Sequence, residues 1–340
     1  MNKEHVKEEL APIAVFAYNR LDKIQQTIEC LKNNTLASDS YIYIFCDGPK
    51  DESDAIEVAR VREYLSTIEG FKRIHIVNRK KNIGLASSII SGVSKIIDKY
   101  GKIIVVEDDI LTSRFFLEYM NNGLNDYSDN SSVMAISGYS APYNKSNLPD
   151  FYFLPYFACW GWATWKDSWE KFVRDPKQLI LSATITDIYR INISGSSPDM
   201  WEQVVDNYRK KIRTWAIFFH SIICINGGLV LFPKCSLCSN IGFDGSGTNC
   251  EKTKLFDLKL DEKDSLPKLP CDVRSNPIAY KRLIDFNNKR IKFNDRLYYF
   301  ALRIVFNRFI LLTVLKVRKI KKGILYKYEN KRLHKIATTK

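Results

Sequence analysis

The sequence predicts an α/β protein with a mostly parallel central sheet and flanking helices, and two patterns indicate this class. The first is a set of short runs rich in β-branched and aromatic residues, typical of strands buried on both faces: residues 13–18, 41–46, 74–77 and 102–106. The second is a set of amphipathic segments between them, with apolar residues at helical spacing: residues 21–31, 55–68 and 85–96. This alternation favours parallel strands joined by right-handed crossovers.

The regular alternation ends after residue 109. Further helices and strands are expected at 115–124, 133–138, 200–210, 215–225 and 229–232. Between them lies an aromatic-rich segment, residues 151–172, which contains Trp160-Gly161-Trp162. A glycine there lets the backbone approach a ligand closely. The alternative is that these tryptophans only pack in the core.

Three carboxylates, Glu107-Asp108-Asp109, stand where the fourth predicted strand ends. Adjacent negative charges repel one another and resist burial, so a neutralising partner is expected. Mg²⁺ and Mn²⁺ take oxygen ligands and are shared between carboxylates and substrate phosphates. In open parallel sheets the ligand crevice lies at the carboxyl ends of the strands. The sequence therefore predicts a metal site for a phosphorylated substrate, with a solvated acidic turn as the alternative.

Charge is distributed unevenly along the 340 residues. Residues 281–340 carry 18 Lys and Arg against 3 Asp and Glu, a net charge of +15, so the other 280 residues have a net charge of −1. A neutral body argues against nucleic-acid binding and assigns the basic surface to the C-terminal tail. At 45% hydrophobic residues, the chain has enough apolar material for a sizeable core.

Two further features suggest a cytoplasmic protein. No run reaches 18 apolar residues, and the charged segment Met1–Glu9 is not followed by the apolar run of a signal peptide.

Cys235 and Cys238 form a C-x-x-C pair, but a structural zinc site needs two more ligands, and only Cys224 and Cys250 are near enough in sequence. Reduced thiols are the simpler expectation.

Six motifs occur in an order that resembles glycosyltransferases of the GT-A fold, among them the bacterial relatives of N-acetylglucosaminyltransferase I and other family 2-like enzymes. They span about residues 10–250 and comprise Ala17-Tyr18-Asn19-Arg20, Phe45-Cys46-Asp47-Gly48, Asn82-Ile83-Gly84-Leu85-Ala86, Val106-Glu107-Asp108-Asp109, Trp160-Gly161-Trp162-Ala163-Thr164-Trp165 and Asn240-Ile241-Gly242-Phe243-Asp244-Gly245-Ser246-Gly247. Each motif alone is weak, and the order of all six carries the resemblance.

The resemblance implies a nucleotide-sugar donor, most simply UDP-linked, and a Mn²⁺ or Mg²⁺ ion. The residues that it places around the donor are Asn19, Arg20, Asp47, Asn82, Gly84, Glu107, Asp108, Trp160 and Gly161. Asp109 matches the direct metal ligand, and Asp108 lies near the ribose or a metal-bound water. An acceptor hydroxyl on a glycan or lipid-linked saccharide would then attack the anomeric carbon with inversion, as in surface polysaccharide biosynthesis.

At the position expected for the general base, this sequence departs from the family pattern. Relatives often carry an acid just after a tryptophan, but the corresponding position here is Ala216, which cannot accept a proton. Glu202, after Trp201 at an expected helix start, is the preferred substitute, and Asp244 in the Gly-rich loop is the second. The alternative for Glu202 is a solvated acid that only favours the helix dipole.

Two other functions compete with this one. A nucleotidyltransferase would normally show a Gly-rich phosphate loop after the first strand, and residues 17–20 lack it. A non-catalytic, membrane-associated relative of the same fold is the other alternative, and Ala216 motivates it.

The chain is expected to divide into three parts. Residues 1–250 form the GT-A catalytic domain, with a nucleotide-sugar-binding half at 10–110 and an acceptor half at 111–250; residues 251–280 form a linker, and 281–340 a basic amphipathic helical tail. Within the tail, residues 297–328 mix aromatic and basic side chains, which favours binding to the anionic inner face of the cell membrane. The alternative is a helix pair packed on the catalytic domain.

Overall fold

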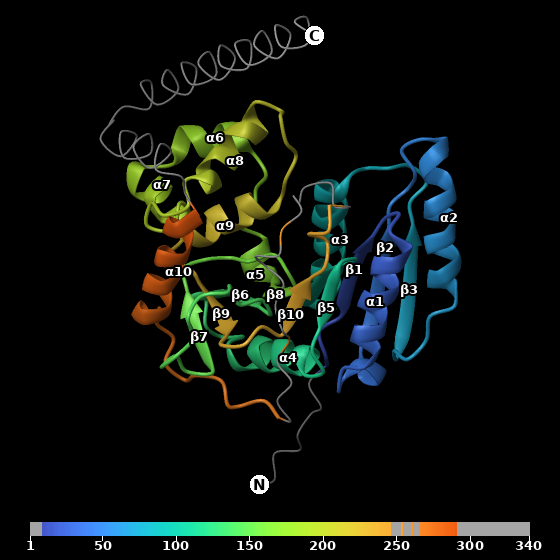
Figure 1. The fold of residues 1–340 in the computed structure, drawn as a ribbon, viewed down its shortest axis with the longest axis horizontal. Helices are drawn as coiled ribbons and strands as arrows, with labels where there is room; N and C mark the ends of the chain where they lie inside the picture. Colours follow the sequence, from blue (N-terminus) through green and yellow to red (C-terminus); the bar gives the residue numbers. More distant parts are fainter. Residues whose placement is uncertain (1–8, 246–252, 254–259, 261–264, 291–340) are drawn as a thin grey trace, which may run out of the picture. The chain divides into compact units, whose positions relative to one another are not determined.

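The computed structural model describes residues 9–245, 253, 260 and 265–290 of the chain. The chain divides after Asn288 into two units, and the first, Met1–Asn288, contains the fold described here. Its centre is an eight-stranded sheet with strand order β3-β2-β1-β4-β8-β6-β9-β7 (Figure 1). Helices flank the sheet, so the predicted α/β class is confirmed.

The first half of the sheet has the predicted βαβ organisation. Its four parallel strands are β1 (Ile13–Ala17), β2 (Tyr41–Cys46), β3 (Arg73–Asn78) and β4 (Lys102–Glu107). The helices between them are α1 (Leu21–Lys32), α2 (Glu52–Ser66) and α3 (Leu85–Tyr100), and a short 3₁₀ turn, η1 (Ala37–Asp39), precedes β2. Every strand and helix expected in this half is confirmed.

The strand order explains where a ligand crevice forms. The chain moves from β1 outward to β2 and β3, and then returns to place β4 on the other side of β1. Right-handed crossovers therefore put α1 and α2 on one face of the sheet and α3 on the other. The carboxyl ends of β1 and β4 lie at the point where the direction reverses, which is where open α/β sheets bind ligands.

The second half makes the sheet mixed. Its strands are β6 (Val133–Ser137), β7 (Phe151–Leu154), β8 (Trp162–Trp165) and β9 (Leu229–Pro233). Strand β8 lies between β4 and β6 and runs antiparallel to both, and β7 is antiparallel to β9, whereas β6 and β9 are parallel. The parallel pairs thus dominate only in the first half. The aromatic-rich segment supplies β7 and β8, which its sequence did not predict.

A second sheet has two strands, one from each half of the sequence. It pairs β5 (Ile110–Thr112) antiparallel with β10 (Cys238–Asn240). Next to it, the Ser113 amide donates to the Leu237 carbonyl at 2.8 Å. Because β5 directly follows the acidic triplet, this pairing brings the start of the Gly-rich loop to the end of β4.

The remaining helices pack around the second half (Figure 1). They are α4 (Phe116–Asp126), α5 (Lys166–Trp169), α6 (Pro176–Ser182), α7 (Ile185–Ile191), α8 (Asp199–Tyr208) and α9 (Ala216–Ile225). Trp162 is fully buried and stacks on Trp215, with ring centroids 5.2 Å apart. Buried His220 accepts from the Phe157 amide at Nδ1 and contacts the Ile191 carbonyl through Nε2 at 2.9 Å.

Helix α10 (Pro277–Arg290) packs on the core through the buried side chains of Ala279 and Leu283. It starts within the segment expected to be a linker and continues into the expected tail. The membrane segment 297–328 and the rest of the tail lie outside the described residues. Among the residues that are described, no helix is both long and apolar enough to cross a bilayer.

Candidate active site

The acidic triplet lies at the carboxyl end of β4, as predicted. Glu107 is the last residue of that strand, and the side chains of Asp108 and Asp109 follow it into a buried position, with residue exposures of 5% and 7%. The Asp108 carbonyl accepts from the Thr27 hydroxyl of α1 at 2.8 Å, which fixes the turn against the neighbouring helix. Two ionisable side chains are thus held away from water at the expected ligand crevice.

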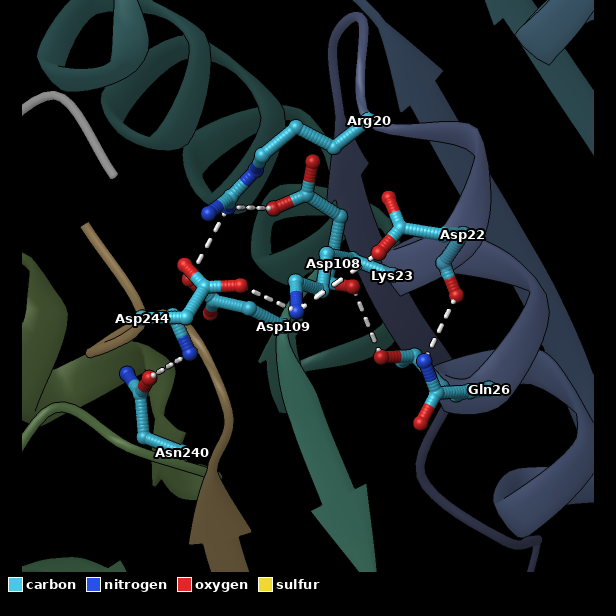
Figure 2. A network of polar contacts seen from close by, with 10 residues as sticks. Arg20, Asp22, Lys23, Gln26, Asp108, Asp109, Asn240 and Asp244 are labelled. Carbon is cyan, nitrogen blue, oxygen red and sulfur yellow. Dashed lines mark hydrogen bonds and ion pairs between the residues drawn. The ribbon is translucent and has the colours of Figure 1, made fainter. Parts of the chain in front are cut away.

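Arg20 is the cation that meets these carboxylates (Figure 2). It follows β1, and its Nη2 donates both to Asp108 Oδ1 and to Asp109 Oδ2, the latter at 2.9 Å. Its Nη1 is buried and has no hydrogen-bond acceptor among the residues that the structure describes. A buried donor without an acceptor is costly. A ligand that offers an acceptor to Nη1 would remove this cost.

One guanidinium does not neutralise three carboxylates. Burial, reinforced by repulsion from Asp109 and Asp108, raises the pKa of Glu107 to about 8. Burial also raises the pKa of Asp108 to about 6, although the adjacent Arg20 opposes this rise. Burial disfavours the charged form of Arg20, but Asp108 and Asp109 outweigh it and raise the pKa of Arg20 above its usual value. The cluster therefore favours additional positive charge.

The donor set fits a hard divalent cation. Asp108 Oδ1 and Asp109 Oδ2 converge on a single nitrogen, Arg20 Nη2, so their oxygens already point to one cationic position. Carboxylate oxygens of this kind suit Mg²⁺ or Mn²⁺, which take one or two protein carboxylates and complete their shell with phosphates and water. No group of three or more His, Cys, Asp and Glu in the described part of the chain is arranged to hold a metal. A divalent ion held by these two Asp side chains would need oxygens from a substrate or water to complete its shell.

Asp47 holds the neighbouring turn through hydrogen bonds from backbone amides. This residue is 4% exposed, and its carboxylate accepts from the amides of Gly48 at 3.0 Å, Ile83 at 3.1 Å and Gly84 at 3.0 Å. Asn82 adds a bond from Nδ2 to the Gly48 carbonyl at 2.9 Å. Three predicted donor-binding residues, Asp47, Asn82 and Gly84, are therefore brought together. Gly84 directly precedes α3 and has φ = 77°, a conformation that favours glycine.

Asn19 lies beside this turn, at the end of β1. Its Nδ2 donates to Asp54 Oδ1 of α2 at 2.7 Å, and the same carboxylate accepts from the Lys50 amide at 3.2 Å. The Lys50 ammonium lies 5.1 Å from the centre of the Tyr18 ring. The loops after β1 and β2 are thus joined into one wall, next to Arg20.

The Gly-rich loop closes on the acidic cluster (Figure 2). The Ile241 amide donates to the Asp109 carbonyl at 2.9 Å, and the Gly242 amide donates to Asn240 Oδ1 at 2.7 Å. A Cβ on Gly242 would lie 2.2 Å from Asp109 Oδ2, so only glycine fits there. Asp244 pairs with Lys23 of α1 at 2.6 Å. Part of the predicted site, Asp244 included, is therefore next to Asp109.

Trp160 contacts the same loop, and Gly161 packs beside Phe116. The Trp160 ring meets those of Tyr139 and Phe243 edge to face, with centroids 4.5 and 5.3 Å apart. Gly161 has φ = 58°, and a Cβ there would lie 2.9 Å from the Phe116 ring. Close packing by itself therefore requires this glycine, whereas Trp160 contacts the Gly-rich loop directly.

Glu202 is in the first turn of α8, within the group of helices formed by α6, α7, α8 and α9. Ala216, where relatives often carry an acid, is the first residue of α9 and follows buried Trp215. The nearby Arg213 donates to the Ser87 hydroxyl at 2.7 Å, which connects this group of helices to the first turn of α3.

Two residues in the site were not predicted, Lys23 and Gly242. Lys23 is 9% exposed although it occupies a polar position of an amphipathic helix, and its partner is more than 200 residues away. Gly242 was named only as part of the Gly-rich loop, with no role of its own. For the zinc hypothesis, Cys224 and Cys238 are buried and Cys235 is exposed, while Cys250 lies outside the described residues.

The family model of glycosyl transferase family 2 matches residues 13–187, just over half of the chain. This chain belongs to glycosyl transferase family 2. The predicted resemblance and the GT-A fold are confirmed. The family match includes β1–β4 and the acidic triplet but ends before Glu202, Ala216 and the Gly-rich loop. Among curated proteins, none matches this chain.

Several solved structures are similar to this glycosyltransferase at low identity. GalNAc-T7 with UDP, GalNAc and Mn²⁺ is 13% identical with a TM-score of 0.42, and the match covers 68% of this chain and 44% of that one. A mannosyltransferase from Pyrobaculum calidifontis with GDP-Man and Mn²⁺ is 12% identical, with a TM-score of 0.36 and coverage of 64% and 72%. S. aureus TarS is 10% identical, with a TM-score of 0.29 and coverage of 43% and 25%. The chain thus spans less than half the length of the first of these proteins.

Proposed function

We propose that this family 2 glycosyltransferase moves a sugar from a nucleotide-diphosphate sugar, with UDP as the expected nucleotide, to a glycan or lipid-linked saccharide. The observation that carries the proposal is the unbalanced pairing around Arg20. Two buried aspartates converge on one cation, while the buried Nη1 of that cation lacks an acceptor in the described part of the chain. A metal–diphosphate ligand would supply both a cation for the aspartates and an anion for the arginine.

Asp109 and Asp108 would hold Mn²⁺ or Mg²⁺, which when bound would stabilise the negative charge on the departing nucleoside diphosphate. Around it, the 10–110 half would bind the nucleotide, because Asp47 fixes the turn that carries Asn82 and Gly84. Asn19 would orient the same wall through Asp54. Glu107, the last residue of β4, would lie beside the metal ligands, and Trp160 with Gly161 would border the donor sugar.

The acceptor would bind to the 111–250 half and attack with inversion, helped by a carboxylate base. Glu202 is our first choice for this base because it stands at a helix start in the group that contains Ala216. Asp244 is the second choice, since its loop contacts Asp109 through Ile241. Its ion pair with Lys23 stabilises the carboxylate and so weakens it as a base.

The proposed setting is surface polysaccharide biosynthesis at the inner face of the cell membrane. Residues 297–328 would bind anionic lipids there, which would bring the site close to a lipid-linked acceptor. The body of the protein, with its net charge of −1 over 280 residues, gives no reason to expect a nucleic-acid partner.

Thermal unfolding with UDP-, GDP- and dTDP-sugars, each with Mn²⁺ or with a chelator, tests the donor. A ligand at about 100 times its dissociation constant stabilises the folded protein by about 2.7 kcal/mol, which for a chain of this size is a shift on the order of 5 °C. We expect one nucleotide to give this shift only with Mn²⁺. If no donor stabilises the protein and none is hydrolysed, the chain is the non-catalytic relative that Ala216 suggests.

A further inference from the structure

We propose that Arg20 exchanges partners during ligand binding. In the ligand-free protein its guanidinium takes the position of the divalent cation between Asp108 and Asp109. When the metal binds, Arg20 leaves the two aspartates and pairs with the phosphates of the donor. This inference rests on the proposed function, and it adds a positioning role that the family membership does not assign.

The first argument is steric and electrostatic. Nη2 lies 2.9 Å from Asp109 Oδ2 and is also hydrogen-bonded to Asp108 Oδ1. A Mg²⁺ ion binds carboxylate oxygens at about 2.0–2.1 Å. An ion that used these two oxygens would overlap Nη2 and would also repel the positive guanidinium. The metal and Arg20 therefore compete for the same pair of oxygens.

The second argument is the unsatisfied half of the side chain. Among the described residues, buried Nη1 has no hydrogen-bond acceptor, although the Arg20 side chain keeps 21% of its surface exposed. A guanidinium carries five donors in a planar fork, and phosphate oxygens match that fork. Once the side chain turns away from the aspartates, a phosphate would supply the acceptor that Nη1 lacks in its present position.

The third argument is that the backbone at Arg20 is held in place. Arg20 precedes the first residue of α1, and its carbonyl accepts from the Ile24 amide at 3.1 Å. The proposed exchange is therefore a change of side-chain rotamer at a fixed helix start. Metal and nucleoside diphosphate are then expected to bind cooperatively, because each favours the same new position of Arg20.

The test compares the variant Arg20→Gln with the wild type and with Arg174→Gln as a matched control. Arg174 is another partly buried arginine, and its guanidinium donates to the Thr214 carbonyl at 2.7 Å and to Asn207 Oδ1 at 2.8 Å. Both variants remove one positive charge, but only Arg20→Gln frees the two oxygens. Mn²⁺ binding is measured by electron paramagnetic resonance without nucleotide, and UDP binding by calorimetry at saturating Mn²⁺.

We expect opposite changes in Arg20→Gln. Mn²⁺ should bind about ten- to a hundredfold more tightly, because no charged hydrogen bonds have to be broken first, and UDP should bind more weakly by a similar factor. Arg174→Gln should change Mn²⁺ binding less than about threefold. Equal Mn²⁺ affinity in Arg20→Gln and the wild type, or a loss of both ligands together, would refute the exchange while leaving the proposed function in place if the wild type binds UDP with Mn²⁺.

A measurement on the wild-type protein covers the case in which Arg20→Gln does not fold. The guanidinium ¹⁵N resonances of Arg20 should shift when diamagnetic Mg²⁺ is added, and shift again when UDP follows. Unchanged resonances at saturating Mg²⁺ would overturn the exchange. If the wild type binds neither Mn²⁺ nor UDP, the proposed function fails together with this inference.

Discussion

Replacing Asp47 tests whether this residue holds the turn at the ligand crevice. Its carboxylate accepts from the amides of Gly48, Ile83 and Gly84 at 3.0–3.1 Å. In Asp47→Asn, the shape is retained, but one oxygen becomes an NH₂ group that faces amide donors. Hydrogen bonds to a charged group contribute about 1.5–3 kcal/mol each. Since one acceptor oxygen remains, we expect the free energy of unfolding to fall by about 2–4 kcal/mol.

The assay is urea-induced unfolding without nucleotide, followed by circular dichroism. The control is Asp22→Asn, which removes the same charge from a side chain that is 71% exposed and should change stability by less than about 0.5 kcal/mol. If Asp47→Asn matches this control and only weakens nucleotide binding, Asp47 serves the ligand and does not hold the turn.

Three further predictions concern the base, a buried histidine and the tail. Glu202→Gln should lower turnover by about 10²–10⁴-fold with donor affinity unchanged, measured by steady-state kinetics; a change below about threefold would transfer the role to Asp244 or another residue. Burial lowers the pKa of His220 to about 4, below its unfolded value near 6.5, so its contribution is complete above pH 6.5 and is lost as the pH falls toward 4. Urea titrations should then show a loss of up to about 3 kcal/mol over this window, and His220→Leu should flatten that slope. The full chain should sediment with anionic but not neutral vesicles at low salt, whereas a chain ending at Arg290 should remain in the supernatant; equal sedimentation of both would refute membrane binding through 297–328.

The first half of the fold was predictable because its signals are local. β1 and β4 are continuous apolar runs, and α3 carries its apolar residues at helical spacing, so sequence and structure agree there. By contrast, β8 has four residues within an aromatic segment, and it becomes a strand because β4 and β6 flank it. The three-residue strands β5 and β10 likewise exist only as a pair.

The candidate site shows the same limit. The sequence predicted the edge of the sheet and its acidic residues, because strand ends and charges are visible locally. It did not predict that Arg20 would bridge Asp108 and Asp109, or that Lys23 would meet Asp244. Such pairs join residues 88 or more positions apart, and only the folded chain brings them within contact.

The central claim is that Asp108 and Asp109 form the metal site of a working glycosyltransferase. Its most direct test is hydrolysis of the nucleotide sugar with Mn²⁺ by the wild type and by Asp109→Ala at saturating donor. The account predicts that Asp109→Ala loses turnover while its circular dichroism spectrum is unchanged, and that its ligand-free form is as stable as the wild type or more stable, because the buried carboxylates repel one another. Turnover close to that of the wild type would contradict the assignment.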